Sequence, residues 1–465
     1  MNLAHTTLLS VALTCFTGEA QQKIDKGYYF VQSVSTYHLP QYSAITGKPL
    51  PGDSVTDAVK ILEALKKTGI DGVEYEPLWF DSVNLSVHKR IAQTNKQYGI
   101  DLWESDWRLA EKINQEAFGP VPEECAAWGI SADGTITLLR DSLGRVQIDP
   151  LNPLSVYWLL NKNRKESYGS FLASLRGDVQ GYFFDETRLL RGISPNGMAR
   201  PGYWLLPAYS PAVLALWKKY CADNNLTDAN GKRIDKFPVH KKAWAAKNTS
   251  TYFQQGYQEI IDLSGWKTFG EFPRDGIIWE HWYRFISQTF ANEWLFPIAD
   301  FADSVLGGTE NWKGIAYFQL IPWGLDFTDS LLTNTVIPGK GRWGAWAHAF
   351  GIDLRSISRS STIKYFICEG YPPLTELQKQ YFSVFKNIVI SEGKKFGMMV
   401  HRDDSGGLNE MEENERWQLI RNLEPSIIAR YLVKKLLSDL VGATQESGHQ
   451  FYLMLDNYRK QKLNE

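Results

Sequence analysis

Residues 181 to 187 read Gly181-Tyr182-Phe183-Phe184-Asp185-Glu186-Thr187, a short apolar run that ends in two adjacent carboxylates. Apolar residues without polar alternation predict a strand that is covered on both faces, as in a parallel sheet. Side chains just past the carboxyl end of such a strand lie where open α/β sheets and (β/α)8 barrels keep their functional groups. Asp185 and Glu186 are therefore the first candidates for a functional site.

A second apolar run ends in the same way. Residues 363–368 read Ile-Lys-Tyr-Phe-Ile-Cys and lead directly into Glu369. We expect Glu186 and Glu369 to face each other across one cleft, because the carboxyl ends of parallel strands meet at one edge. One protonated and one ionised carboxyl group on either side of a bond is the arrangement that cleaves glycosides, and retaining pairs lie roughly 5–5.5 Å apart. On this hypothesis Glu186 is the acid/base, kept neutral by Asp185 and by aromatic neighbours, and Glu369 is the nucleophile.

Strand and helix patterns alternate along the rest of the chain, which predicts βα units and a parallel sheet. Eight strands are expected, at residues 27–31, 70–76, 100–104, 182–184, 314–320, 351–354, 363–368 and 396–400. The sequence thus predicts one (β/α)8 TIM barrel as a catalytic domain over residues 21–465, with 182–184 as the fourth strand and 363–368 as the seventh. Insertions are expected after strand 3, where Asp133-Gly134 marks a hairpin turn, and after strand 4. Single helices are expected over 152–175 and 277–305, and the chain from about residue 410 is expected to be helical.

The composition favours a carbohydrate as the partner. The formal net charge is −2, so nothing points to nucleic acid or to an anionic membrane. Aromatic residues make up 13% of the chain, and this fits either a heavy aromatic core or rings that stack on the faces of sugars. Candidate substrate-binding residues at or beyond the expected strand ends are Trp79, Trp103, Trp107, Trp323, Trp343, Asp185 and His401. Glu76, Glu104 and Asp106 could bind hydroxyl groups or form a solvated rim.

Residues 1–20 have the pattern of a secretory signal peptide, with a short apolar run from Leu8 to Phe16 and small residues before Gln21. This predicts a secreted or periplasmic protein. The run is too short to span a bilayer, and no other stretch of the sequence is expected to span one. After cleavage Cys125, Cys221 and Cys368 would remain, with neither a disulfide framework nor a metal spacing, and we expect buried free thiols.

Three segments together resemble a known family. They are Gln147-Ile148-Asp149-Pro150, then Tyr182 to Glu186, and then the helix that begins at Ser210-Pro211. In this layout the chain resembles the clan A retaining glycoside hydrolases, and among them the family 42 β-galactosidase type. The resemblance implies an acid/base Glu after strand four, a nucleophile Glu after strand seven, and galactosides as first substrates. The clan normally has Asn before the acid/base; here Asp185 could still accept a hydrogen bond from the sugar 2-hydroxyl.

Two other functions remain open on the sequence. An α-glycosidase-type barrel would use Asp185 as its nucleophile, and an inactive barrel would only bind carbohydrate. The letters of Gly339-Lys340-Gly341-Arg342-Trp343-Gly344 match a dinucleotide motif, but no strand precedes them, and we expect no cofactor and no metal. The long insertions could close one end of the cleft or form an interface in a homo-oligomer.

Overall fold

The computed structural model describes residues 27–34, 66, 69–75, 82–106, 109, 118–130, 136–140, 144–185, 187, 203–204, 210–227, 231–233, 244–245, 276–319, 353–370, 376–402, 410–431 and 454–460. The expected signal peptide, its cleavage point and the Asp133-Gly134 turn lie outside these residues.

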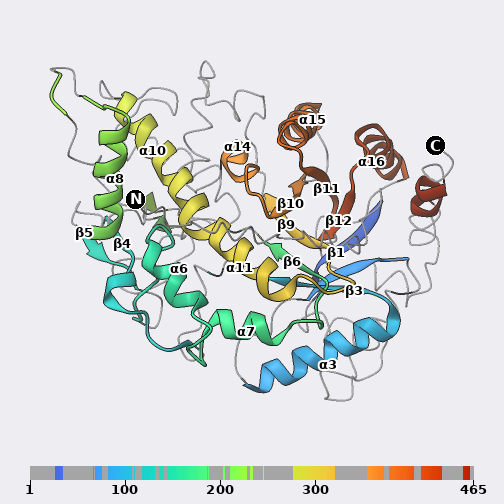
Figure 1. Cartoon of the computed structure of the whole chain (residues 1–465). Helices are drawn as coiled ribbons and strands as arrows, with labels where there is room; N and C mark the ends of the chain where they lie inside the picture. Colours follow the sequence, from blue (N-terminus) through green and yellow to red (C-terminus); the bar gives the residue numbers. More distant parts are fainter. Residues whose placement is uncertain are drawn as a thin grey trace, which may run out of the picture.

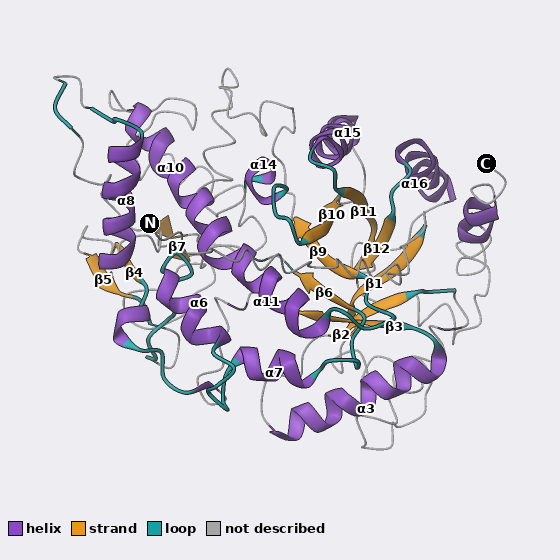
Figure 2. Ribbon diagram, in the orientation of Figure 1, coloured by secondary structure: helices purple, strands orange, loops and turns teal. Residues whose placement is uncertain are grey.

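Eight parallel strands form a closed barrel, which confirms the expected fold class (Figures 1 and 2). In chain order they are β1 (Tyr28–Val34), β2 (Gly72–Tyr75), β3 (Asp101–Ser105), β6 (Gly181–Phe184), β9 (Gly314–Gln319), β10 (Ile363–Glu369), β11 (Lys395–Arg402) and β12 (Ile427–Tyr431). The order around the ring is the order along the chain, and β12 closes the ring on β1. Followed once around the ring, the strand register slips by about eight residues, the shear of a (β/α)8 barrel.

Two expectations near the C-terminus are wrong, and correcting them renumbers the last strands while the barrel keeps eight. Residues Leu354–Ile357, which overlap the strand expected at 351–354, form the short helix α14. The C-terminal part is not helical throughout, because α16 (Glu410–Leu423) is followed by β12. β12 begins with two β-branched residues and is buried between β11 and β1, which favours a strand. β10 is therefore the sixth strand of the barrel, and β11 is the seventh.

Helices cover the outside of the barrel (Figure 2). α3 (Ser82–Tyr98) packs against β3, and α15 (Glu376–Ser391) packs against β10 and β11 beside α16. α10 (Gly276–Phe290), the π-helical segment η3 (Ala291–Leu295) and α11 (Phe296–Leu306) follow one another without a break, which confirms the helix expected over 277–305. In Figure 1 this helix runs from the left edge of the molecule to the barrel, where α11 contacts β9.

The chain between β3 and β6 holds a hairpin and two helices. The short helix η2 (Glu123–Cys125) precedes the antiparallel strands β4 (Trp128–Ile130) and β5 (Ile136–Leu138), which confirms the expected pairing. One helix was expected over 152–175, but α6 (Pro153–Leu160) and α7 (Tyr168–Ser174) are separate. Each has its own N-cap, Asn152 and Ser167, whose side chains accept hydrogen bonds from main-chain N–H groups.

Between β6 and β9 the structure describes three further elements before α10. These are the antiparallel pair β7 (Tyr203–Trp204) and β8 (Trp244–Ala245), and the helix α8 (Pro211–Asp223). Ser210 caps α8 and Pro211 occupies its first turn, as the Ser-Pro pair predicts. Figure 1 shows α8 beside α10, away from the barrel strands, and the two helices are in contact.

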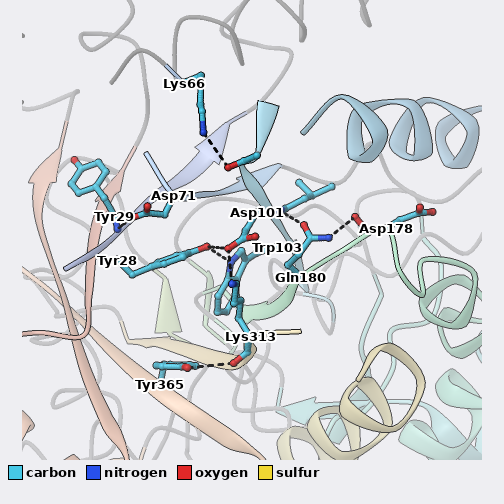
Figure 3. A network of polar contacts seen from close by, with 12 residues as sticks. Tyr28, Tyr29, Lys66, Asp71, Asp101, Trp103, Asp178, Gln180, Lys313 and Tyr365 are labelled. Atoms are coloured by element: carbon cyan, nitrogen blue, oxygen red, sulfur yellow. Dashed lines mark hydrogen bonds and ion pairs between the residues drawn. The ribbon is translucent and has the colours of Figure 1, made fainter. Parts of the chain in front are cut away.

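The amino-terminal end of the barrel is closed by a polar network (Figure 3). The hydroxyl of Tyr28 donates to Asp101 at 2.9 Å, the indole N–H of Trp103 donates to the same hydroxyl at 3.1 Å, and the Lys313 ammonium lies 3.6 Å from Asp101. Tyr365 donates to the main-chain carbonyl of Lys313 at 3.3 Å. The network joins β1, β3, β9 and β10 at their amino-terminal ends.

A C-terminal helical segment, residues 454–460, contacts the segments that lead into β1 and β2. The guanidinium of Arg459 donates to the carbonyls of Gly27 and Gly69 and to the carboxylate of Asp71. Tyr458 is buried beside Gly27. Among the helices that the structure describes, none is both long and apolar enough to span a bilayer.

Candidate functional site at the carboxyl end of the barrel

Three buried carboxylates belong to the inner face of the barrel. Phe183 and Ile367 pack in the cluster of side chains that fills the barrel interior, whereas their neighbours Phe184 and Cys368 pack in the outer cluster, under the helices. Because side chains alternate along a strand, Asp185 and Glu369 fall on the inner face. Asp185 is 1% exposed and Glu369 is 3% exposed.

Glu74 is the third carboxylate on the inner face. Val73 belongs to the outer cluster, so alternation turns the fully buried Glu74 inward from β2. The prediction from the sequence did not include Glu74, although the expected strand at 70–76 contains it. A buried charge within an otherwise apolar strand was the available signal.

Asp185 and Glu369 belong to the same layer of the barrel. β6 and β10 both pair with β9. Continuing the β6–β9 register by one residue puts Asp185 beside Phe318, and Phe318 in turn pairs with Ile367 of β10. In a barrel with a shear of about eight over eight strands, residues at the same height along the axis are offset from the pairing register by about one residue per strand. Between β6 and β10, which are two strands apart, the offset is about two residues. This places Glu369, two residues beyond Ile367, level with Asp185. The two carboxylates therefore flank the end of β9 at the carboxyl mouth of the barrel.

The corrected strand order bears on the role of Glu369. The resemblance places a nucleophile after the seventh strand, but Glu369 ends β10, the sixth. The seventh strand, β11, ends with His401 and Arg402, whose side chains lie outside the described part of the structure. The expectation that Glu369 follows the seventh strand is wrong. On the ring, β10 lies opposite β2, so Glu369 and Glu74 come from facing strands.

Asp106 lies directly after β3 and holds the segment that follows β6. Its Oδ1 accepts a hydrogen bond from the main-chain N–H of Asp185 at 3.0 Å, and its Oδ2 accepts one from the hydroxyl of Thr187. Burial raises the pKa of the Asp106 carboxyl well above its ordinary value, and these two hydrogen bonds oppose the rise. Asp106 is fully buried, so it does not belong to a solvated rim.

Glu104 is also buried, but it faces the outside of the barrel. Its neighbour Trp103 points inward, and the charge of Glu104 acts on Tyr168 of α7 and Tyr182 of β6. The two tyrosine hydroxyls are hydrogen-bonded at 2.8 Å. Burial raises the pKa of both tyrosines well above the ordinary value, with Glu104 and Asp106 adding to it. The two predictions for Glu104, that it binds substrate hydroxyl groups or belongs to a solvated rim, do not fit this position.

Trp103 lies in the barrel core. It is 1% exposed, and its ring contacts Phe30 at 5.5 Å and Tyr365 at 6.3 Å between centroids. Its N–H donates to Tyr28 within the polar network at the amino-terminal end of the barrel (Figure 3). Neither face of its indole is open to a sugar, so Trp103 is not retained as a platform.

The remaining candidates are not placed by the structure. Glu186, Trp79, Trp107, Trp323 and Trp343 lie outside the described residues. Glu186 is bracketed by Asp185 and Thr187, both of which are described and buried. Among the described residues, no group of three or more His, Cys, Asp and Glu side chains could hold a metal ion.

The closed parallel ring and the carboxylates at its mouth define a (β/α)8-type barrel protein with an acidic end. No protein-family model matches the chain, and no curated protein sequence matches it. Solved structures similar to it include the endo-β-1,4-mannanase of Thermotoga petrophila, at 9% identity and a TM-score of 0.40, covering 89% of this chain and 68% of that one.

Two further structures match at a similar level. The β-1,4-mannanase of the sea hare Aplysia kurodai has 10% identity and a TM-score of 0.35, covering 89% of this chain and 93% of that one. The old yellow enzyme homologue of Zymomonas mobilis has 8% identity and a TM-score of 0.36, covering 89% of this chain and 88% of that one. Likeness at this level does not distinguish one barrel protein from another.

Proposed function

We propose that the protein is a secreted glycoside hydrolase that cleaves O-glycosidic bonds of poly- or oligosaccharides at the carboxyl mouth of its barrel. The observation that carries the proposal is the shared layer of Asp185 and Glu369, two buried carboxylates on strands that flank β9. Glu186 follows Asp185 directly. Asp185, Glu186 and Glu369 are therefore three candidates for two roles, the acid/base and the nucleophile.

In the favoured mechanism the Glu369 carboxylate attacks the anomeric carbon while Glu186 gives its proton to the departing glycosidic oxygen. The C–O bond breaks and a glycosyl ester of Glu369 forms. Glu186 then takes a proton from water, the water oxygen attacks the same carbon, and the ester bond breaks to release the sugar with retained configuration. Asp185 would accept a hydrogen bond from the sugar 2-hydroxyl. The resemblance to the family 42 type makes β-galactosides the first substrates to test.

A second assignment makes Asp185 the nucleophile, as in α-glycosidase-type barrels. It is favoured by the position of Glu369 on the sixth strand, which removes the family argument for that residue. It is also favoured by the burial and inward register of Asp185 at the end of the fourth strand. A third outcome, binding without turnover, would identify a carbohydrate-binding barrel.

Substitution of each carboxylate decides between these assignments. We expect Glu369→Ala and Glu186→Ala to lower kcat on aryl β-glycosides by about 10³-fold or more, within the range of lost nucleophilic and acid/base catalysis. Azide should restore Glu369→Ala with inversion and Glu186→Ala with retention. Turnover of aryl α-glycosides, with azide rescue of Asp185→Ala with inversion and none of Glu369→Ala, would establish the second assignment. Glu376→Gln, an exposed carboxylate at the start of α15, is the matched control and should leave kcat unchanged.

A further inference from the structure

We propose that Asp106 is a positioning residue for Glu186, because it bonds the main-chain N–H of the residue before Glu186 and the side-chain hydroxyl of the residue after it. The inference deepens the proposed function and rests on it. Asp106 itself touches neither substrate nor the reacting atoms in this role. It would act by fixing the direction in which the Glu186 side chain leaves the end of β6.

The hydrogen bonds around residues 185–187 support this role. Asp106 accepts from the N–H of Asp185 at 3.0 Å and from the hydroxyl of Thr187, so its carboxyl group bridges the residues before and after Glu186. The main-chain N–H of Asp106 donates to the carbonyl of Phe183 at 3.2 Å, which ties it to β6. Tyr317 of β9 donates to the carbonyl of Thr187 at 3.1 Å. The segment is thus attached to both strands that neighbour β6.

The residues that make these contacts are buried. Asp106 and Thr187 are buried, and Tyr317 is 1% exposed. The titratable groups that act on Asp106 or are acted on by it are Asp185, Tyr168, Tyr182 and Tyr317, and Glu104 acts on the same two tyrosines, Tyr168 and Tyr182. Burial favours the neutral carboxyl of Asp106 and thereby limits the negative charge beside Asp185. A hydrogen bond in a buried site is costly to leave unmade, which makes this bridge a rigid one.

Asp149 provides a matched comparison within the same chain. Its Oδ1 accepts from the N–H of Leu151 at 2.9 Å, and its Oδ2 accepts from the hydroxyl of Ser210. Asp149 is also fully buried, but it joins the start of α6 to the N-cap of α8 rather than the mouth of the barrel. Variants of the two aspartates therefore remove the same kinds of contact at different places.

Amide hydrogen exchange of the full-length protein tests the positioning directly. In Asp106→Ala, peptides that span residues 181–190 should exchange about tenfold faster than in the unchanged protein, because the Asp185 N–H loses its acceptor. Asp149→Ala should leave these peptides unchanged. Asp106→Asn can still accept from the N–H of Asp185 and donate to the Thr187 oxygen, so it should restore most of the protection. Thr187→Val removes one contact alone, and Thr187→Ser retains it.

Kinetics with two leaving groups test the connection to Glu186. Misdirection of an acid/base by about 1 Å can cost about 100-fold, and the loss falls on leaving groups that need a proton. We expect Thr187→Val and Asp106→Ala to lower kcat/KM, which reports the step in which Glu186 acts as the acid, by about 30- to 100-fold on a methyl glycoside and by less than about threefold on a 2,4-dinitrophenyl glycoside. Thr187→Ser should recover the methyl glycoside rate.

Each outcome decides between the two proposals. Unchanged exchange at 181–190 in both Asp106→Ala and Thr187→Val, or equal losses on the two glycosides, would overturn the positioning role. A lack of turnover in the unchanged protein would refute the glycosidase proposal, and exchange at 181–190 would still test whether Asp106 holds the segment. If Asp106→Ala does not fold, Thr187→Val and Asp106→Asn carry the same tests.

Discussion

The indole of Trp103 packs directly against the α-carbon of Gly181, its register partner on the neighbouring strand. A β-carbon on Gly181 would overlap the six-membered ring of the indole, so a glycine is required there. A β-carbon on Gly72 would likewise overlap the hydroxyl of Tyr28. Large rings thus fill the amino-terminal half of the barrel by packing against glycines on the neighbouring strand.

We expect Gly181→Ala to lower the free energy of unfolding by about 2–3 kcal/mol, since neither the strand nor the enclosed ring can move far. Urea unfolding followed by fluorescence would measure this. Combining Gly181→Ala with Trp103→Leu should cost less than the sum of the two single changes, because the smaller side chain frees the space. Additive effects would contradict direct packing of the two residues.

Asp149 should make stability depend on pH. Burial raises the pKa of its carboxyl to about 7, while hydrogen bonds from Ser210 and Leu151 oppose the rise. The folded protein therefore holds this proton over the range from about pH 4 to about pH 7, where the unfolded chain has lost it. The contribution to stability is full below about pH 4 and is lost as the pH rises through about 7, with a slope of at most about −1.4 kcal/mol per pH unit.

Asp149→Asn should reduce that slope, because the amide cannot titrate. Unfolding by urea at several pH values between about 4 and 8 would show a flatter dependence than in the unchanged protein. Asp223→Asn, at an exposed carboxylate that pairs with Lys219, is the control and should leave the slope as it is. An equal slope in Asp149→Asn and the unchanged protein would mean that the pKa of Asp149 is not raised in the folded protein.

Arg459 should contribute more to stability than the neighbouring Lys460. Arg459 bonds two main-chain carbonyls and Asp71, so Arg459→Ala should cost about 1–2 kcal/mol. Lys460 pairs with Asp456 at 2.5 Å in an exposed i,i+4 arrangement, and Lys460→Ala should cost less than about 0.5 kcal/mol. Similar losses in the two variants, measured by urea unfolding, would mean that the C-terminal segment does not clamp the barrel.

Thiol titration should report both the burial of the cysteines and the cleavage of the expected signal peptide. Cys125, Cys221 and Cys368 are free and buried, as expected from the sequence, and burial raises the pKa of Cys125 and of Cys221 to about 11. Ellman's reagent at about pH 8 should therefore react slowly with the native protein and completely after unfolding. Cleavage of residues 1–20 predicts three thiols in the unfolded secreted protein, whereas a chain that keeps Cys15 would give four.

Much of the barrel could be predicted because its strands are apolar on both faces. Tyr182 to Phe184 and Ile363 to Cys368 have no polar alternation. α15 packs on the second of these strands, and Tyr168 of α7 bonds to Tyr182 of the first, as that pattern requires. Ile427–Tyr431 escaped prediction because it is short, carries Arg430 and follows a helix closely. Its strand form is set by two neighbours that are distant in sequence, β11 and β1. Local propensity could not supply that information.

The site could be predicted only in part for a related reason. A carboxylate at the end of an apolar strand can be read directly, and Asp185 and Glu369 are found at one mouth. Which strand faces which depends on the count, and Glu369 moved from seventh to sixth place because the strand expected at 351–354 is absent from the barrel, where residues 354–357 form the helix α14. Trp103 shows the other limit, because its position on the strand, in the middle rather than at the end, decides that it fills the core.

The ring is completed by residues 427–431, so almost the whole chain must be synthesised before β1 gains its second neighbour. At roughly 5–20 residues per second a ribosome needs about 20 to 90 seconds to reach that point. During this time the nascent barrel has two unpaired edges, which invite association with other chains. A chaperone that shields these edges, or transport of the chain before it folds, would protect the protein until its last strand arrives.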